Sequence, residues 1–198
     1  MDDCDKEFWE SYIDIDDLWV YDKLILSKKL GYYCGPAGTL PEKEDYYIVK
    51  PCVNFRGISR GASIQLLSPK HSDSVPDGYF WCERFTGKHI SIDYTHSKQV
   101  LAVEAFKEDE DRLDRFTAWR KINDFDFMLP SVLEPISKKY ERLNIEAIGG
   151  NVIDVHLRHN PNFVGHDGDV IIPIWKEEFF NAPYGDRIGF IVKKENRP

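Results

Sequence analysis

Short apolar stretches, several of them alternating with polar residues, recur through most of the chain and predict β-strands. Aromatic and β-branched residues are concentrated in these stretches, and glycine- or proline-bearing loops separate them, as is typical of strands. The predicted strands span residues 46–50, 62–67, 78–85, 89–96, 99–106, 143–148 and 152–158, with one further strand in the C-terminal tail. Three of them follow one another through short turns, which indicates an antiparallel meander.

Two other segments carry apolar residues at helical spacing. Residues 20–30 are predicted to form a helix that ends at Gly31, and residues 131–143 a second helix with Ser131 as its N-cap. Strands in antiparallel order with few helices predict an α+β fold. A chain of 198 residues, 42% of them hydrophobic, has room for one substantial core or for two small lobes that share a cleft.

Composition and charge exclude several functional classes. The net charge of −8 argues against a general nucleic-acid binder, which needs a basic surface. No run of residues approaches the roughly eighteen apolar positions of a membrane span, so no membrane partner is expected. The N-terminal residues are acidic and lack the apolar core of a secretory signal, so we expect a cytoplasmic protein. Its cysteines, Cys4, Cys34, Cys52 and Cys82, form no CxxC motif and are expected to be free thiols.

A β-hairpin over residues 143–158 is the most informative local signal. Two strands flank a Gly-Gly-Asn sequence, which is a strong turn signal. On the second strand, Asp154, His156 and Arg158 lie two residues apart and therefore share one face. This face places acidic, imidazole and guanidinium groups side by side.

The length of the turn decides which residues face one another across the hairpin. A three-residue turn at 149–151 puts Glu146 opposite Asp154 and Asn144 opposite His156, whereas a two-residue turn would put the two carboxylates on opposite faces. Facing carboxylates repel, so one should take up a proton more readily than a free acid unless a cation offsets the charge. Oxygen ligands favour Mg²⁺ or Mn²⁺ as that cation. The alternative is that both carboxylates simply face water.

A glycine-bearing loop at residues 54–61 follows a predicted strand that ends in Lys50. A lysine at this position is well placed to contact a phosphate, and glycines let the backbone approach an anion closely. A solvated surface loop would have the same composition. The loop also matches the GxSxG motif of serine hydrolases, with Ser59 as nucleophile, but the segment after it alternates like a strand where that motif requires a helix.

The segment 81–96 predicts a second kind of contact. The strand edge from Glu83 to Phe85 offers backbone groups that could bind a purine, with Ile48 and Phe85 as apolar walls, and His89 lies just beyond the turn. An ordinary hairpin explains the same pattern equally well.

Taken in order, several segments resemble the ATP-grasp superfamily. They are DKLILSKKLG, YIVKP with NFRGISRGA, CERFTGKHISID, and NIEAIGG followed by IDVHLR, and they extend from about Asp22 to Phe163. The resemblance implies a two-lobed ATP-grasp-like α+β fold with antiparallel sheets that hold ATP between them. The expected organisation is a lead-in at 1–21, a first lobe at 22–84, and a second lobe at 85–198 that contains the metal-binding hairpin 143–158.

The resemblance also assigns roles to individual residues. Two lysines and the glycine loop would contact the phosphates, an acid at the hinge and its neighbours would hold adenine, and a histidine would lie at the ribose. The residues that would bind ATP are Lys23, Lys50, Arg56, Gly57, Arg60, Gly61, Glu83, Arg84, Phe85 and His89. Glu146, Asp154 and His156 would bind Mg²⁺ or Mn²⁺. The catalytic residues would be Lys50 and Arg158, which would steady the transferred phosphoryl group.

The implied function is an ATP- and Mg²⁺-dependent ligase that activates a carboxylate as an acyl phosphate for attack by an amine. Its substrates would be ATP with a small-molecule or peptide carboxylate and amine. Two departures from the family pattern, Asp154 for a glutamate and His156 for an asparagine, leave a non-catalytic nucleotide-binding module as the alternative, and a hydrolase using Ser59 as a third. The N-terminal domain that usually precedes the lobes is absent, so a homodimer or a partner that supplies that domain is expected.

Overall fold

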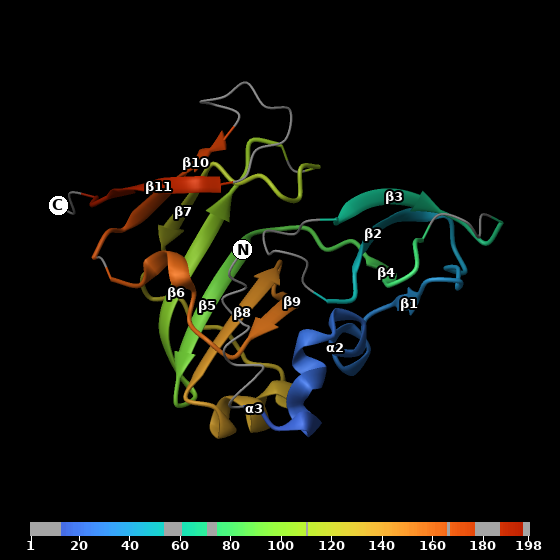
Figure 1. The fold of residues 1–198 in the computed structure, drawn as a ribbon, viewed down its shortest axis with the longest axis horizontal. Coiled ribbons are helices and arrows are strands. Elements are labelled where there is room, and N and C mark those ends of the chain that lie inside the picture. Colours follow the sequence, from blue (N-terminus) through green and yellow to red (C-terminus); the bar gives the residue numbers. More distant parts are fainter. Residues whose placement is uncertain are drawn as a thin grey trace.

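The structure is a computed structural model that contains two antiparallel β-sheets (Figure 1). It describes residues 13–53, 61–70, 75–109, 111–165, 167–176 and 187–195. The smaller sheet has four strands in the order β1-β4-β2-β3. These strands are β1 (Cys34–Pro36), β2 (Asp45–Pro51), β3 (Ser63–Leu67) and β4 (Tyr79–Glu83). The predicted strands at 46–50, 62–67 and 78–85 are therefore confirmed, whereas β1 was not predicted because it is short and carries Gly and Pro.

The larger sheet has seven strands in the order β11-β10-β7-β6-β5-β8-β9. They are β5 (His89–Thr95), β6 (Lys98–Phe106), β7 (Ala118–Lys121), β8 (Arg142–Ile148), β9 (Asn151–His156), β10 (Val170–Trp175) and β11 (Arg187–Lys193). Neighbouring strands pair antiparallel throughout. Figure 1 shows the two sheets side by side, with the chain passing from β4 to β5 between them. Two antiparallel sheets with few helices confirm the predicted α+β fold.

The helices are short and differ from the prediction at their ends. They are the 3-10 helices η1 (Ile15–Tyr21), η2 (Ser131–Leu133) and η3 (Pro161–Phe163), and the α-helices α2 (Lys23–Lys29) and α3 (Glu134–Lys139). The predicted helix at 20–30 is divided at Asp22, whose carboxylate accepts hydrogen bonds from the backbone N–H groups of Leu24 and Ile25 and so starts α2. None of the described helices is long and apolar enough to cross a membrane.

The predicted helix at 131–143 is shorter in the structure. It ends at Lys139, because Arg142 already begins β8, and Pro130 rather than Ser131 takes the N-cap position of its 3-10 start. The alternating residues that follow pack into the sheet, and this burial outweighs the helical spacing of the preceding turn.

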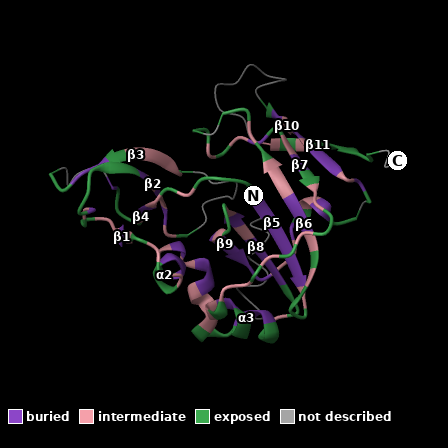
Figure 2. Ribbon diagram, turned by 180° about the vertical axis from the view of Figure 1, so that it is seen from behind, coloured by how far each residue is buried: buried purple, intermediate pink, exposed green. Residues whose placement is uncertain are grey.

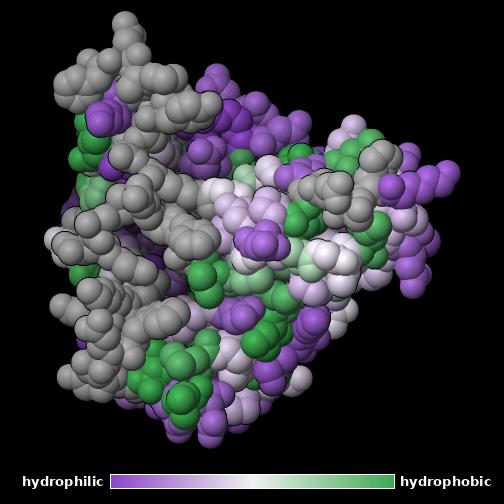
Figure 3. All heavy atoms as spheres, turned by 45° about the vertical axis from the view of Figure 1, so that its right-hand side comes forward, coloured by the Kyte–Doolittle hydropathy of each residue, from purple (hydrophilic) through white to green (hydrophobic). Residues whose placement is uncertain are grey.

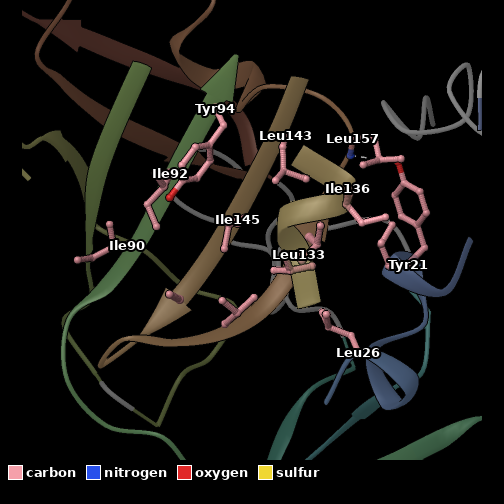
Figure 4. Packing of buried hydrophobic residues seen from close by; sticks show 14 residues of the cluster. Tyr21, Leu26, Ile90, Ile92, Tyr94, Leu133, Ile136, Leu143, Ile145 and Leu157 are labelled. Carbon is pink, nitrogen blue, oxygen red and sulfur yellow. Dashed lines mark hydrogen bonds between the residues drawn. The ribbon is translucent and has the colours of Figure 1, made fainter. Parts of the chain in front are cut away.

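The main core lies on one face of the larger sheet. Ile90 and Ile92 of β5 alternate with polar residues, as do Leu143 and Ile145 of β8, so that their apolar side chains share a face. Figure 4 shows these residues packed against Leu133 and Ile136 near α3 and against Tyr21 and Leu26 of η1 and α2. The buried strands are also visible at the centre of Figure 2. The opposite face carries the polar residues of the same strands, and this face bears the site.

The β8–β9 hairpin confirms the predicted pairing through a different turn. Glu146 lies opposite Asp154 and Asn144 opposite His156, but Ile148 pairs with Asn151, so the turn has two residues. A β-bulge on β9 restores the register, because Ile153 is an extra residue between two paired positions. The expectation that a two-residue turn would separate the carboxylates is therefore wrong.

Candidate functional site

A cavity of about 500 Å³ lies where the two sheets meet. It is lined by residues of α2, β2 and β4 on one side, by β6, β8 and β9 on the other, and by the β4–β5 connection. The volume falls in the range of small-molecule sites. On the face of the molecule seen in Figure 3, hydrophobic and hydrophilic areas are interspersed rather than gathered into one apolar patch.

Most of the predicted site residues that the structure describes line this cavity. They are Lys23, Lys50, Glu83, Arg84, Phe85, His89, Glu146 and Asp154. Gly61 lies outside the lining but next to it, because a Cβ there would be 3.2 Å from the ring of Pro51, which does line the cavity. Arg56, Gly57, Ser59 and Arg60 lie outside the described residues. Segments far apart in the sequence thus meet around one cavity.

Two ammonium groups lie at one end of the cavity. Lys23 is the first residue of α2, and its Nζ lies 2.7 Å from Oδ2 of Asp154. Lys50, near the end of β2, donates a hydrogen bond of 3.3 Å from Nζ to the carbonyl oxygen of Ile153. This carbonyl belongs to the extra residue of the bulge, which is left unpaired in the sheet ladder and therefore faces the lysine.

The charge state of Lys50 is set by its surroundings. Burial, together with repulsion from Lys23, lowers the pKa of Lys50 to about 8. The ammonium is therefore mostly charged at neutral pH but titrates within an accessible pH range. Both lysines would attract an anion that enters the cavity.

The facing carboxylates lie beside these cations. Burial opposes ionisation of Asp154, but the charges of Lys23 and His156 outweigh it, so the pKa of Asp154 lies below its ordinary value. Burial likewise opposes ionisation of Glu146, and its contact with His89 outweighs this, so the pKa of Glu146 is also lowered. The expectation that one of the two carboxylates takes up a proton more readily is therefore wrong, because protein cations offset the repulsion.

Glu146 and His89 form a second contact on the cavity wall. Nε2 of His89 lies 3.4 Å from Oε2 of Glu146, and its ring packs edge-on against Phe116 with 5.2 Å between centroids. The other ring nitrogen, Nδ1, is buried without a hydrogen-bond partner among the residues that the structure describes. Buried polar atoms are seldom left unsatisfied, so this position fits a ligand group or water.

The β4–β5 connection forms another part of the cavity wall. Glu83 at the end of β4 is held to the segment before β1, because its Oε1 accepts a 2.8 Å hydrogen bond from the backbone N–H of Tyr33. The ring of Phe85 lies 4.6 Å from that of Tyr32, edge to face. Ile48, Phe85 and Ile148 add apolar side chains to the cavity lining. The Glu83 carboxylate thus holds protein structure, and the backbone beyond it borders the cavity.

Arg158 and His156 do not line the cavity. Nη1 of Arg158 donates to the carbonyl oxygen of His159 at 3.1 Å, and Nε2 of His156 lies 3.7 Å from Oδ2 of Asp154. The polar face beyond the cavity is filled by protein, since Nδ2 of Asn144 donates to Oγ of Ser91 and Oδ1 of Asp93, both at 2.8 Å. The side chains near Arg158 are thus engaged within the fold.

Several lining residues were missed by the sequence analysis. They include Ser27, Tyr32, Cys82, Glu104, Phe106 and Leu113. Tyr32 lies in a loop before a strand that was not predicted, and Leu113 lies in a run of charged residues at 107–115. Among these missed residues, only Ser27 could have been identified from the sequence, because it lies one helical turn after Lys23 and therefore on the same face of the helix.

A divalent cation at the cavity would depend on carboxylate ligands. Among the residues described, no three His, Cys, Asp or Glu side chains lie close enough together to hold a metal ion, so Glu146, Asp154 and His156 do not form a ready three-ligand site. Mg²⁺ is commonly bound by one or two carboxylates with phosphate oxygens and water. The two carboxylates at the cavity wall fit this requirement.

Comparison with known proteins places the fold. No protein-family model matches the chain, and no curated protein matches it by search. A solved structure from Archaeoglobus fulgidus, described as an ATP-grasp superfamily protein, superposes with a TM-score of 0.52 at 16% identity over 88% of this chain. An L-amino acid ligase from Bacillus licheniformis has a TM-score of 0.46 at 10% identity over 72% of this chain and 41% of its own.

The chain spans less than two thirds of the first of these structures, 63% of its length. At such low identity the likeness concerns the fold and not the activity. The arrangement of two antiparallel sheets around one cavity, together with this superposition, establishes that the chain has an ATP-grasp-like fold.

Proposed function

We propose that the protein binds ATP in the cavity between its two sheets and uses it as an ATP- and Mg²⁺-dependent carboxylate–amine ligase. The proposal rests on the convergence of Lys23 and Lys50 with Glu146 and Asp154 in one cavity that is also lined by the apolar side chains Ile48, Phe85 and Ile148. A nucleotide likewise combines charged phosphates with a flat apolar base.

The phosphates would lie at the lysine end. Lys50 is anchored to the carbonyl of Ile153 and Lys23 to Asp154, so both ammonium groups are already held near the space that a phosphate would occupy. A charge-assisted contact to a phosphate oxygen contributes about 1.5–3 kcal/mol. The predicted glycine loop at 54–61 would close over the phosphates, although most of it lies outside the described residues.

The adenine would lie at the β4–β5 connection. Ile48, Phe85 and Ile148 supply apolar contact, and the backbone of residues 84–86 supplies hydrogen-bonding groups on the cavity wall. The ribose would lie beside His89, whose buried Nδ1 can take a hydrogen bond from a ligand or water. This arrangement follows the lobes expected from the sequence, 22–84 and 85–198.

Glu146 and Asp154 would hold the Mg²⁺ ion. When bound with the nucleotide, the ion would neutralise charge on the phosphates and so favour phosphoryl transfer. The Lys23 ammonium forms an ion pair with the Asp154 carboxylate in this structure. For Asp154 to bind the metal, this ion pair would have to break and Lys23 would have to turn toward the phosphates. Lys23 and Lys50 would then stabilise the charge that develops on the transferred group.

The fold resemblance supports the proposed reaction class, in which a carboxylate is activated as an acyl phosphate and an amine attacks it. The cavity residues named here would bind and orient ATP. A partner protein or a second copy of the chain would help to hold the acid and the amine. Placement of Arg158 outside the cavity favours the second candidate, a nucleotide-binding module without catalysis.

Two measurements test these proposals in turn. Calorimetric titration with ATP and Mg²⁺ should show binding that Lys50→Ala weakens about tenfold or more. Lys98→Ala, a change at an exposed lysine of β6, is the matched control and should leave affinity unchanged. ADP release that depends on an added carboxylic acid would then identify a ligase, and nucleotide binding without such release would identify the binding module. Unchanged affinity in Lys50→Ala would remove this cavity as the nucleotide site.

A further inference from the structure

Two cysteines lie directly opposite each other at the edge of the smaller sheet. Cys34 of β1 pairs in register with Cys82 of β4, although 48 positions separate them in the sequence numbering. β1 is an edge strand, which leaves Cys34 partly exposed, while Cys82 is buried and its side chain borders the cavity. One thiol of the pair is therefore accessible and the other lies at the site.

The hydrogen-bond pattern brings these two residues especially close. The backbone N–H of Glu83 donates to the carbonyl of Tyr33 at 2.9 Å, one position outside the pair on each strand. Cys34 and Cys82 are thus a non-hydrogen-bonded pair of the antiparallel ladder. Such pairs have Cα atoms about 4.5 Å apart and side chains on the same face. Disulfides form across Cα separations of about 4.4–6.8 Å, so the pair is within bonding range.

The surroundings of the thiols favour reaction at Cys34. The neighbouring Cys82 thiol, with Lys28 and Lys50 nearby, lowers the pKa of Cys34. The Cys34 thiol, together with burial, raises the pKa of Cys82. The thiolate is the reactive form of cysteine, so the accessible member of the pair is also the better nucleophile.

We propose that Cys34 and Cys82 are a redox-active pair that forms a reversible disulfide between β1 and β4 at the wall of the cavity. The oxidant is a small disulfide such as oxidised glutathione. The Cys34 thiolate attacks one of its sulfurs, which forms a mixed disulfide and releases one glutathione thiolate. Cys82 then loses its proton to solvent, and its sulfur attacks that of Cys34, which breaks the mixed disulfide and releases a second thiolate. Two thiols are oxidised and one external disulfide is reduced.

The bond would add a covalent link between the edge strand β1 and the strand β4, whose Cys82 lines the cavity. β1 follows α2, which carries Lys23 and Ser27, and β4 ends at Glu83 beside the base end of the cavity. The closed covalent loop would contain all of β2 and β3. Because such a loop restricts the unfolded chain, the oxidised protein should melt at a higher temperature than the reduced protein.

The test uses the whole chain in its native state. The protein is incubated with oxidised glutathione, remaining thiols are alkylated, and the digested protein is analysed by mass spectrometry without reduction. The expected result is a linked peptide containing Cys34 and Cys82, its loss after treatment with dithiothreitol, and a rise in melting temperature that accompanies the link. Cys52→Ser should retain the link, since Cys52 lies outside the pair.

Variants of each partner separate the two steps. In Cys82→Ser, Cys34 should keep one glutathione adduct because nothing resolves it. In Cys34→Ser, Cys82 should stay unmodified in the folded protein. The proposal is overturned if wild-type protein accumulates only the glutathione adduct, if Cys34 links instead to Cys4 or Cys52, or if the link forms only in denaturant. None of these outcomes depends on nucleotide binding.

Discussion

Replacement of Lys23 by methionine tests whether the buried ion pair between α2 and β9 stabilises the fold. Nζ and Oδ2 lie 2.7 Å apart, and the side chains are only 10% and 11% exposed. At this distance and an effective dielectric constant of 20, the Coulomb attraction is about 6 kcal/mol before desolvation is counted. Desolvation offsets part of this, and breaking a buried pair from one side costs about 3–5 kcal/mol, because an uncompensated charge stays buried.

The free energy of unfolding should be measured by urea denaturation at pH 7 for wild type, Lys23→Met, Asp154→Asn and the double variant. Each single change should destabilise by about 3–5 kcal/mol and the double change by less than their sum. Lys138→Ala, which removes an exposed pair with Glu134 at 3.5 Å, is the control and should cost under about 0.5 kcal/mol. The reasoning would be refuted if each single variant lost less than about 1 kcal/mol of unfolding free energy and the two losses summed to that of the double variant.

The pH dependence of this pair has a definite sign. The pKa of Asp154 is lowered in the folded state, so its stabilisation is complete above the unfolded value of about 3.9 and is lost as pH falls toward the folded value. The coupling between Lys23 and Asp154 should therefore be constant from pH 5 to 7 and decline below about pH 4.

Three further predictions concern the cavity. Because the pKa of Lys50 is about 8, ATP affinity should fall up to about tenfold between pH 7 and pH 9, whereas Lys50→Arg should keep its affinity across this range in calorimetric titrations. Glu83→Gln keeps an acceptor oxygen for its backbone partner and should be nearly neutral in urea denaturation, whereas Glu83→Ala should cost about 1 kcal/mol; equal costs would contradict this role. Gly149→Ala would place Cβ 2.1 Å from the carbonyl oxygen of Thr86, so it should destabilise by about 1–3 kcal/mol more than Gly150→Ala, which meets nothing within 4 Å; equal melting temperatures would contradict it.

Local patterns in the sequence predicted the features that depend on neighbouring residues. Alternation identified β5, β6, β8 and β9, and the glycine pair identified the hairpin turn. The pairing of Glu146 with Asp154 was predicted correctly but for the wrong turn, because the bulge at Ile153 compensates for the shorter turn. The bulged residue Ile153 presents its carbonyl oxygen to the ammonium of Lys50, and the alternation of the strand does not indicate this distant contact.

Contacts between distant segments could not be predicted in the same way. The Lys23–Asp154 pair joins α2 to a strand of the larger sheet, and no periodicity links the two positions. Because the sequence does not reveal this ion pair, we expected a bound cation or a proton to offset the repulsion between the facing carboxylates. β1 and β7 were missed because strands of three and four residues are shorter than the window over which alternation can be recognised.

A crystal structure of the protein with a non-hydrolysable ATP analogue and Mg²⁺ would test the proposed site most directly. We predict the base against Phe85 and the backbone of the β4–β5 connection, the phosphates within hydrogen-bond distance of Lys23 and Lys50, and the metal on Glu146 and Asp154, with the Lys23–Asp154 contact lengthened from 2.7 Å. A nucleotide bound elsewhere on the chain, or phosphates that contact neither lysine, would contradict it.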